Sequence, residues 1–482
     1  MVRRCAWHGS HTARDTSHEG IKSAPPSDRR TTKNDERPKQ EKQVVGRRSL
    51  SLLRSSLGKL HPPLTINLKS IMADVTTSPM PIWLDGSHIS PEWMERVANL
   101  VGTCSSSCSA VDISNETRKS GQHAKDGATL RITIKGNDAQ TKTVVMKQVP
   151  DQGLGLSKRL GLAREALFYH NFSHKLSRES TPIIYYSYGD FAKGEKCIIM
   201  ESVQDAVDSG ILFGSGNPNN WNRDLPALIS NAGWNSNDSL PPSSREVALV
   251  TFREIAKIHA VFWRDDKELL TPDKTWLRGQ EWLQGKGRDS WEASQDLVRT
   301  FWKAYLAAEN ESTKPIIHWD DTLRRAVEKA VAHISWEAQL KRLNERGHYT
   351  LVHGDFWPGN VLWMTKERDT IKLLDWEMVG LGSGPQDLGQ YVISNMDPVE
   401  RKECERELIE AYHQELRNRS IDVTFEHCWR EYQVGGVERW LWFLVYFLGN
   451  GMTDWAQFFH NQISAFMADH QLTADDITQP RP

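Results

Sequence analysis

Two neighbouring stretches of sequence decide the fold: residues 351–362 (LVHGDFWPGNVL) and residues 371–377 (IKLLDWE). Their apolar runs predict three short strands, at residues 350–352, 361–364 and 371–374. Polar side chains stand at the ends of these strands. Asp355 and Asn360 lie between the first two, and Asp375 directly follows the third. The sequence therefore predicts two strand–loop units that deliver two aspartates and one asparagine to the same place.

Such a set of oxygen-bearing side chains is typical of sites that transfer a phosphoryl group from ATP. The reaction needs a carboxylate that positions the attacking hydroxyl, and it needs oxygen ligands that hold Mg²⁺ on the phosphates. Asp355, Asn360 and Asp375 supply both requirements.

The spacing of these residues resembles the catalytic and metal-binding loops of the kinase fold, because H-x-D-x-x-x-x-N is followed 15 residues after the Asn by a strand that ends in Asp. His-Gly-Asp at 353–355 and Asp-Trp-Glu at 375–377 stand where protein kinases have His-Arg-Asp and Asp-Phe-Gly. Both variants are similar to the aminoglycoside phosphotransferase and choline kinase superfamily. Its ecdysteroid-kinase-like branch is the best match, since residues 258–263 (IHAVFW) resemble a helix typical of that group.

The resemblance implies a role for each matched residue, over about residues 95–470 of the chain. Asp355 would be the catalytic base, or the carboxylate that orients the hydroxyl. Asn360 and Asp375 would complete the catalytic set and ligate Mg²⁺. His353 would steady the loop, and Asp387 resembles a buried carboxylate that accepts hydrogen bonds from the catalytic-loop backbone.

The nucleotide side of such a site needs a lysine on the third strand and a helical glutamate that holds it. Lys147 ends the run VVMK, and Glu165 follows eighteen residues later in the segment AREALFY. Residues 201–203 resemble a hinge, in which the backbone of Glu201 and Val203 would bind the adenine edge. We therefore expect Lys147, Glu165, Glu201 and Val203 to bind ATP.

Two parts of the site are less well defined by the sequence. No G-x-G-x-x-G precedes the first predicted strands. The small-residue stretch 102–110 (GTCSSSCSA) could cover the phosphates or form a plain turn. Glu377 is a weaker candidate for the ligand of a second metal ion.

The fold class predicted for the whole chain is α+β, a bilobal protein-kinase-like fold. Its small N-terminal lobe would have an antiparallel sheet with one helix, predicted from strands at 128–135, 141–149, 183–188 and 196–201 and a helix at 160–176. The larger C-terminal lobe would be mainly helical, with helices at 246–264, 290–309, 322–345, 398–417 and 428–448. Residues 209–242, rich in Gly, Asn, Ser and Pro, predict an irregular insertion.

Charge is distributed unevenly along the 482 residues, although the formal net charge is only −2. Residues 1–71 hold 15 Lys and Arg against six Asp and Glu, which leaves the rest of the chain with a net charge of −11. An acidic body argues against nucleic acid as the main ligand, because phosphate neutralisation needs a basic face. The expected organisation is a disordered basic extension at 1–71, a nucleotide-binding lobe at 80–205, and a catalytic and acceptor-binding lobe at 206–475.

The cellular compartment is predicted from cysteine usage and hydropathy. Six scattered cysteines in a chain of this length are too few for a disulfide framework, so a reducing compartment is expected. No apolar run reaches the ~18 residues that a membrane span requires. Residues 47–59 (RRSLSLLRSSLGK) are basic and Ser-rich like a transit segment, but six acidic residues lie upstream of them. We therefore expect a cytoplasmic protein.

Nineteen tryptophans leave one structural question open. The aromatic residues around 440–447 and 455–459 could build a cage for a cationic or flat acceptor, or they could simply pack in the core. Their helical spacing favours the core.

The predicted function is an ATP- and Mg²⁺-dependent kinase that phosphorylates a hydroxyl of a small molecule, such as a choline-, aminoglycoside- or steroid-like alcohol. A protein kinase is disfavoured, because eleven residues separate Asp375 from Asp387 and no Ala-Pro-Glu lies between them. The alternative is a catalytically degenerate nucleotide-binding pseudokinase that acts as a scaffold or sensor. The expected partners are ATP and the acceptor.

Overall fold

The described part of the chain lies within residues 79–482, which form one compact unit separate from residues 1–78. The computed structural model describes residues 97, 108–115, 129–136, 141–234, 240–279, 288–333, 336–337, 348–367 and 369–478. The predicted extension at 1–71 is outside these residues. Among the residues that are described, no helix has the length and apolar character needed to cross a bilayer.

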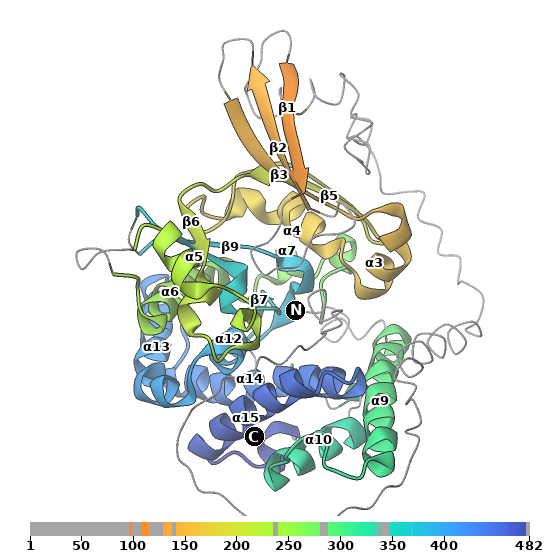
Figure 1. Cartoon of the computed structure of the whole chain (residues 1–482). Coiled ribbons are helices and arrows are strands. Elements are labelled where there is room, and N and C mark those ends of the chain that lie inside the picture. Colours follow the sequence, from red (N-terminus) through yellow and green to blue (C-terminus); the bar gives the residue numbers. More distant parts are fainter. Residues whose placement is uncertain are drawn as a thin grey trace, which may run out of the picture. The chain divides into compact units, whose positions relative to one another are not determined.

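A five-stranded antiparallel sheet forms the N-terminal lobe, in the spatial order β1-β2-β3-β5-β4 (Figure 1). Its strands are β1 (Cys108–Asn115), β2 (Thr129–Gly136), β3 (Thr141–Gln148), β4 (Ile184–Asp190) and β5 (Glu195–Glu201). Alternate residues of β2, β3 and β5 form one buried apolar cluster, which includes Ile132, Val144, Met146, Cys197 and Ile199. Because successive side chains of a strand point to opposite faces, Lys147 of β3 and Lys196 of β5 lie on the other face.

Two helices accompany the sheet, α3 (Leu154–Leu160) and α4 (Arg164–Phe172). The helix predicted over 160–176 is present as α4 with a 3-10 turn at Ser173–Lys175 after it, but it begins only at Arg164, and α3 was not predicted. Gly161 follows α3 with a left-handed φ of 70°, which ends that helix and lets α4 begin three residues later. Helix α4 packs on strands β4 and β5. The ring of Phe168 in α4 stacks on Trp376 of the C-terminal lobe, with 4.1 Å between the ring centroids.

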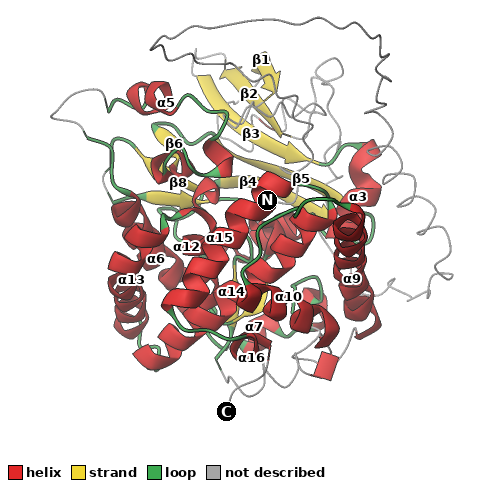
Figure 2. Ribbon diagram, turned by 60° about the horizontal axis from the view of Figure 1, so that its bottom comes forward, coloured by secondary structure: helices red, strands yellow, loops and turns green. Residues whose placement is uncertain are grey.

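The C-terminal lobe is mainly helical, as predicted, and Figure 2 shows most of its helices below the strands, with α5 higher up beside them. They are α5 (Leu225–Asn231), α6 (Ser244–Val261), α7 (Asp266–Leu269), α9 (Arg288–Glu311), α10 (Asp321–His333), α12 (Pro385–Asn395), α13 (Pro398–Asn418), α14 (Phe425–Gly449), α15 (Thr453–Asp469) and α16 (Ala474–Thr478). Helices α12 and α14 cross at Gly389 and Gly436, where a Cβ added to Gly389 would lie 2.7 Å from the Cα of Gly436. Only residues without side chains permit this approach.

Short strands at the top of this lobe carry the loops predicted to hold the site. Strand β7 (Thr350–Val352) pairs with β10 (Gly380–Gly382), and β8 (Val361–Met364) lies between β6 (Ala206–Asp208) and β9 (Ile371–Leu373). The three short strands predicted from the sequence are therefore present.

Several predicted boundaries differ from the structure. The expected irregular insertion at 209–242 contains a 3-10 helix at Ser209–Phe213 and the helix α5, with 235–239 outside the described residues. Helices α12 and α15 were not predicted. Residues 102–107 are outside the described residues, whereas Cys108–Ala110 belong to strand β1 and form neither a turn nor a loop. The β1–β2 connection is at 116–128, also outside the described residues.

The aromatic residues of α14 and α15 are core residues at their centre. Trp440, Phe447 and Phe459 are fully buried, and Phe459 stacks on Trp440 at 4.3 Å and on Phe447 at 5.2 Å. These three rings therefore pack helix against helix and form no cage for a ligand. Trp442 and Trp455 are half-buried at the edge of this cluster.

Candidate active site

The predicted lysine and glutamate of the N-terminal lobe form an ion pair next to Asp375 of the C-terminal lobe. Lys147 Nζ lies 2.5 Å from Glu165 Oε1 and 3.3 Å from Asp375 Oδ1. Lys147 is 6% exposed and Glu165 is fully buried. A buried ion needs a close partner of opposite charge, and here the ammonium has one from each lobe. The structure thus brings together three residues that are separated by up to 228 positions in the sequence.

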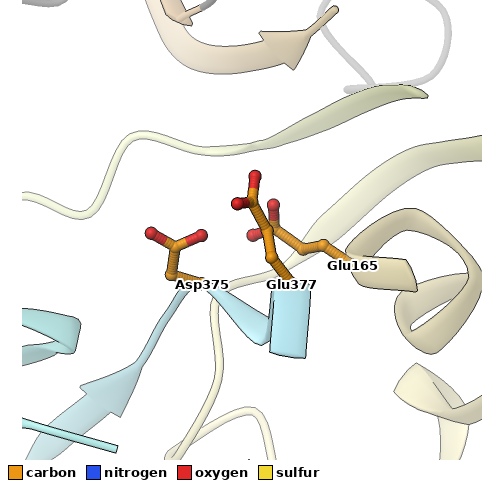
Figure 3. Close-up of side chains that lie close together, drawn as sticks. All are labelled: Glu165, Asp375 and Glu377. Atoms are coloured by element: carbon orange, nitrogen blue, oxygen red, sulfur yellow. The ribbon is translucent and has the colours of Figure 1, made fainter. Parts of the chain in front are cut away.

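The glutamate is placed by aromatic packing below the sheet. Helix α4 carries Glu165 in its first turn and, one turn later, Phe168, which stacks on Trp376. Trp376 stands between Asp375 and Glu377 in the sequence. The same stack therefore holds all three carboxylates together, and one oxygen of each lies within 4.8 Å of the others. Figure 3 shows Glu165 entering from its helix and the two other side chains from the segment after β9.

The loop after β7 is anchored by the buried carboxylate of Asp387 in α12. Its Oδ2 accepts a hydrogen bond from the backbone N–H of His353 at 2.7 Å, and its Oδ1 accepts one from Gly354 at 3.1 Å. This confirms the predicted contact of Asp387 with the loop backbone. His259 of α6 is also fully buried, and its Nε2 lies 3.4 Å from the same Oδ2.

The ring of His353 joins the two loops of the site. Its Nε2 lies 2.9 Å from the carbonyl oxygen of Leu374, the residue before Asp375, and its Nδ1 is 3.4 Å from the backbone nitrogen of Asp355. Both contacts are satisfied together when Nε2 carries the proton and Nδ1 accepts. The buried ring of His353 therefore fixes the spacing between the two aspartates.

Asn360 completes the connection between the loops. Its Nδ2 donates to the carbonyl oxygen of Asp355 at 2.8 Å and lies 3.3 Å from Asp355 Oδ2. The backbone carbonyl oxygen of Asn360 accepts a hydrogen bond from the backbone N–H of Leu374 at 2.9 Å. With Nδ2 directed at Asp355, Oδ1 is the atom of this amide that could ligate a cation. Asp375 follows in a left-handed conformation, with φ 67° and ψ 58°, an uncommon region for a residue other than glycine.

Gly354 is required by the backbone of this loop. It has a φ of 74°, and a Cβ at this position would lie 2.3 Å from the carbonyl oxygen of Met378. We expect Gly354→Ala to destabilise the fold by more than the ~1–2 kcal/mol of a left-handed alanine, because the loop must also move away from Met378. Activity should fall with it.

Gly451→Ala is the matched control for this prediction. Gly451 also has a positive φ, of 69°, but no atom lies within 4 Å of its added Cβ. Urea unfolding of both variants separates the cost of the dihedral from that of the collision. Equal losses of unfolding free energy would contradict the prediction.

The predicted hinge lies at the end of β5, next to this site. Glu201 is the last residue of β5 and is opposite Val144 of β3, while Val203 follows two residues later, outside any helix or strand. The side chain of Glu201 is turned to the backbone nitrogen of Ile183, at 3.0 Å, and to Lys372 Nζ, at 3.3 Å. Only its backbone could therefore serve a nucleotide base, as the hinge prediction requires.

Two residues at the site were not identified from the sequence. Lys196 of β5 is fully buried, with Nζ 2.9 Å from Glu165 Oε2 and 2.5 Å from Glu377 Oε1. Glu377, the weaker candidate for the ligand of a second metal ion, is paired with this lysine and also has an oxygen within 4.8 Å of oxygens of Glu165 and Asp375. Arg439 of α14 donates from Nε and Nη2 to the carbonyl oxygen of Gly354, at 3.1 and 2.8 Å.

The environment of Arg439 perturbs its ionisation. Loss of hydration, with the nearby Arg278 as a second cause, lowers the pKa of Arg439 to about 9. The guanidinium therefore remains charged at pH 7, beside the loop that carries Asp355. A sequence signal for Arg439 is lacking, because it lies 84 residues after Asp355 on a helix whose other residues are mostly apolar.

Comparison with known proteins agrees with this geometry. Residues 229–424 match the model of the ecdysteroid kinase-like family. No curated protein sequence matches the chain.

Three solved structures illustrate the structural similarity. The ethanolamine kinase of Plasmodium vivax has a TM-score of 0.38 and 13% identity, over 76% of this chain and 82% of that chain. The macrolide 2′-phosphotransferase of Brachybacterium faecium has a TM-score of 0.36 and 15% identity, over 80% and 98%. An aminoglycoside 2′-phosphotransferase has a TM-score of 0.38 and 14% identity, over 75% and 94%.

The sequence match covers the loops that carry Asp355, Asn360 and Asp375, together with the helix of His259 and the whole of α12. Over residues 229–424 the chain is therefore similar to the ecdysteroid kinase-like family.

Proposed function

We propose that the protein is an ATP- and Mg²⁺-dependent kinase that transfers the γ-phosphoryl group to a hydroxyl of a small molecule. The observation that carries the proposal is the position of Lys147 Nζ, within 3.3 Å of both Glu165 and Asp375. Lys147, the candidate for phosphate binding in the N-terminal lobe, thus lies against Asp375, the candidate for cation binding in the C-terminal lobe. A nucleotide triphosphate bound there would contact both.

Each residue of the site has a chemical task in this reaction. The acceptor hydroxyl would attack the γ-phosphorus, so that its O–P bond forms while the bond to the β–γ bridging oxygen breaks. Asp355 would orient the hydroxyl and take its proton. Lys147 would bind the phosphates as a point charge, and the backbone of Glu201 and Val203 would bind the adenine edge.

The donor set fits a Mg²⁺ ion. The amide oxygen of Asn360 and the carboxylate of Asp375 are hard oxygen ligands of the type that Mg²⁺ prefers. Asn360 directly precedes β8, and Asp375 follows the end of β9 by two residues. The two strands are adjacent, since Val361 of β8 is paired with Leu373 of β9. The carboxylates of Glu165, Asp375 and Glu377 also lie together here, with one oxygen of each within 4.8 Å of the others. Bound Mg²⁺ would neutralise charge on the phosphates.

The proposal is tested by separating nucleotide binding from transfer. Calorimetric titration with ATP, with and without Mg²⁺, measures the first. Incubation with ATP, Mg²⁺ and choline, an aminoglycoside or a steroid alcohol, followed by mass spectrometry for an added phosphoryl group, measures the second. A small-molecule extract of cells extends the panel. Binding without transfer to any acceptor would favour the pseudokinase alternative, and absence of ATP binding would remove the proposal.

Lys147→Met is expected to lower kcat/KM for ATP by about 10²-fold, the effect typical of removing one preorganised charge from a reacting group. Lys142→Met is the control, because Lys142 lies on the same strand but over the ring of Tyr185. Steady-state kinetics at varied ATP concentration checks the prediction. An unchanged kcat/KM in Lys147→Met would exclude this lysine from the phosphate site.

A further inference from the structure

Lys196 is the second lysine of the site, and its surroundings differ from those of an ordinary strand residue. It is completely buried, in a position near the start of β5, and both of its ion-pair partners are carboxylates. A buried ammonium is tolerated only when it is closely paired. Two short contacts, of 2.9 and 2.5 Å, provide this pairing.

The register of the sheet places Lys196 beside Lys147. Lys147 of β3 is opposite Ile198 of β5, and directly opposed residues of a sheet point to the same face. Lys196 precedes Ile198 by two residues, so its side chain is on that face as well. The two ammonium groups are therefore diagonal neighbours that approach the same helix, α4.

Glu165 is divided between the two lysines. Its Oε1 is 2.5 Å from Lys147 Nζ, and its Oε2 is 2.9 Å from Lys196 Nζ. Both oxygens thus have a cation, which fixes the plane of the carboxylate. The contacts form an alternating series of charges that runs Asp375, Lys147, Glu165, Lys196, Glu377.

Without Lys196, this series would rearrange. Glu165 and Glu377 would remain as like charges with oxygens within 4.8 Å of each other, and Lys147 would still be paired with Glu165. Like charges at this distance repel strongly where water is scarce. Lys147 would be drawn toward the carboxylates and away from a bound phosphate.

We infer that Lys196 is a positioning residue for nucleotide binding: it holds Glu165 so that Lys147 is presented to the phosphates of ATP. This inference rests on the proposed function. Lys196 also joins the sheet of the N-terminal lobe to Glu377, two residues after Asp375, so it fixes the distance between the phosphate-binding lysine and the cation-binding loop.

Lys196→Met is the test, and ATP affinity in EDTA is the main readout, because the contact of Lys147 with phosphate needs no metal. We expect the Kd for ATP to rise about tenfold. This is the low end of the roughly 10–100-fold loss of affinity that follows removal of a residue that orients a ligand-binding group. Lys196→Arg should restore most of the affinity, since a guanidinium can also contact both carboxylates. In kinetic assays KM for ATP should rise while KM for the acceptor stays constant.

Lys193→Met is the matched control. Lys193 lies in the turn before β5 and is also paired with two carboxylates, Asp190 at 3.1 Å and Glu195 at 3.5 Å, but its side chain is 61% exposed. Wild-type ATP affinity is expected there. If Lys196→Met does not fold, as thermal unfolding would show, Lys196→Gln replaces it; a smaller rise of Kd in the same direction is expected.

The outcomes separate this inference from the proposed function. ATP affinity equal to wild type in the folded Lys196→Met or Lys196→Gln protein would overturn the positioning role and leave the kinase proposal intact. Failure of Lys196→Arg to restore ATP affinity would also overturn the positioning role. It would mean that a positive charge between Glu165 and Glu377 does not determine how tightly ATP binds. Absence of ATP binding by the wild type itself would remove both.

Discussion

Asp355→Asn is expected to reduce phosphoryl transfer by about 10²–10⁴-fold, the range attributed to a positioned general base. The amide keeps the size of the side chain but cannot take the proton of the hydroxyl. ATP affinity should remain close to that of the wild type, because Lys147, Asn360 and Asp375 are unchanged. Transfer is measured by mass spectrometry of the product, and ATP binding by calorimetry.

Asp422→Asn is the control for this substitution, since the side chain of Asp422 is fully exposed and forms an ion pair with Arg417 at 3.1 Å. It should behave as the wild type in both assays. Retention of full transfer by Asp355→Asn would refute the role of Asp355, whereas loss of ATP binding together with transfer would mean that the substitution disturbs the whole loop.

Asp387→Ala is expected to have the largest effect on stability, about 3 kcal/mol or more. Two buried backbone N–H groups, of His353 and Gly354, lose a charged acceptor, and each such hydrogen bond is worth about 1.5–3 kcal/mol. The catalytic loop would also shift, and a displacement of about 1 Å can cost 10²-fold in rate. Urea unfolding and transfer assays measure the two effects.

Asp397→Ala is matched to it in chemistry but not in location. Asp397 is exposed and accepts from two backbone N–H groups, of Val399 and Glu400, at the start of α13. Loss of such a helix cap costs about 1 kcal/mol, and transfer should be unaffected. If Asp387→Ala lost no more stability and no more activity than Asp397→Ala, the anchoring role of Asp387 would be wrong.

Local spacing accounts for the parts of the site that were predictable. His353, Asp355 and Asn360 lie in one turn between two short strands, so their order along the chain already limits their separation in space. The partnership of Lys147 with Glu165 was expected from the family resemblance, and the distance of 2.5 Å agrees with it.

The helix boundaries that were predicted wrongly show the limit of periodicity. The helix predicted over 160–176 begins only at Arg164, because Gly161 in its left-handed conformation ends α3 and turns the chain before α4, whose Phe168 meets Trp376. Helix α12 carries buried residues on all sides, among them Leu388, Tyr391 and Ile393. Its polar residues Asp387 and Gln390 are buried together with the apolar ones, so they do not mark a side that faces solvent.

By itself the sequence determined which oxygen-bearing side chains share a loop, because residues a few positions apart cannot separate far. Only the tertiary structure decided which cations face them. Lys196 meets Glu165 and Glu377 through the register of β3 and β5 and the packing of α4, and Arg439 reaches Gly354 through the close crossing of α14 and α12. Register and helix crossing depend on contacts between distant segments, which no local pattern of residues records.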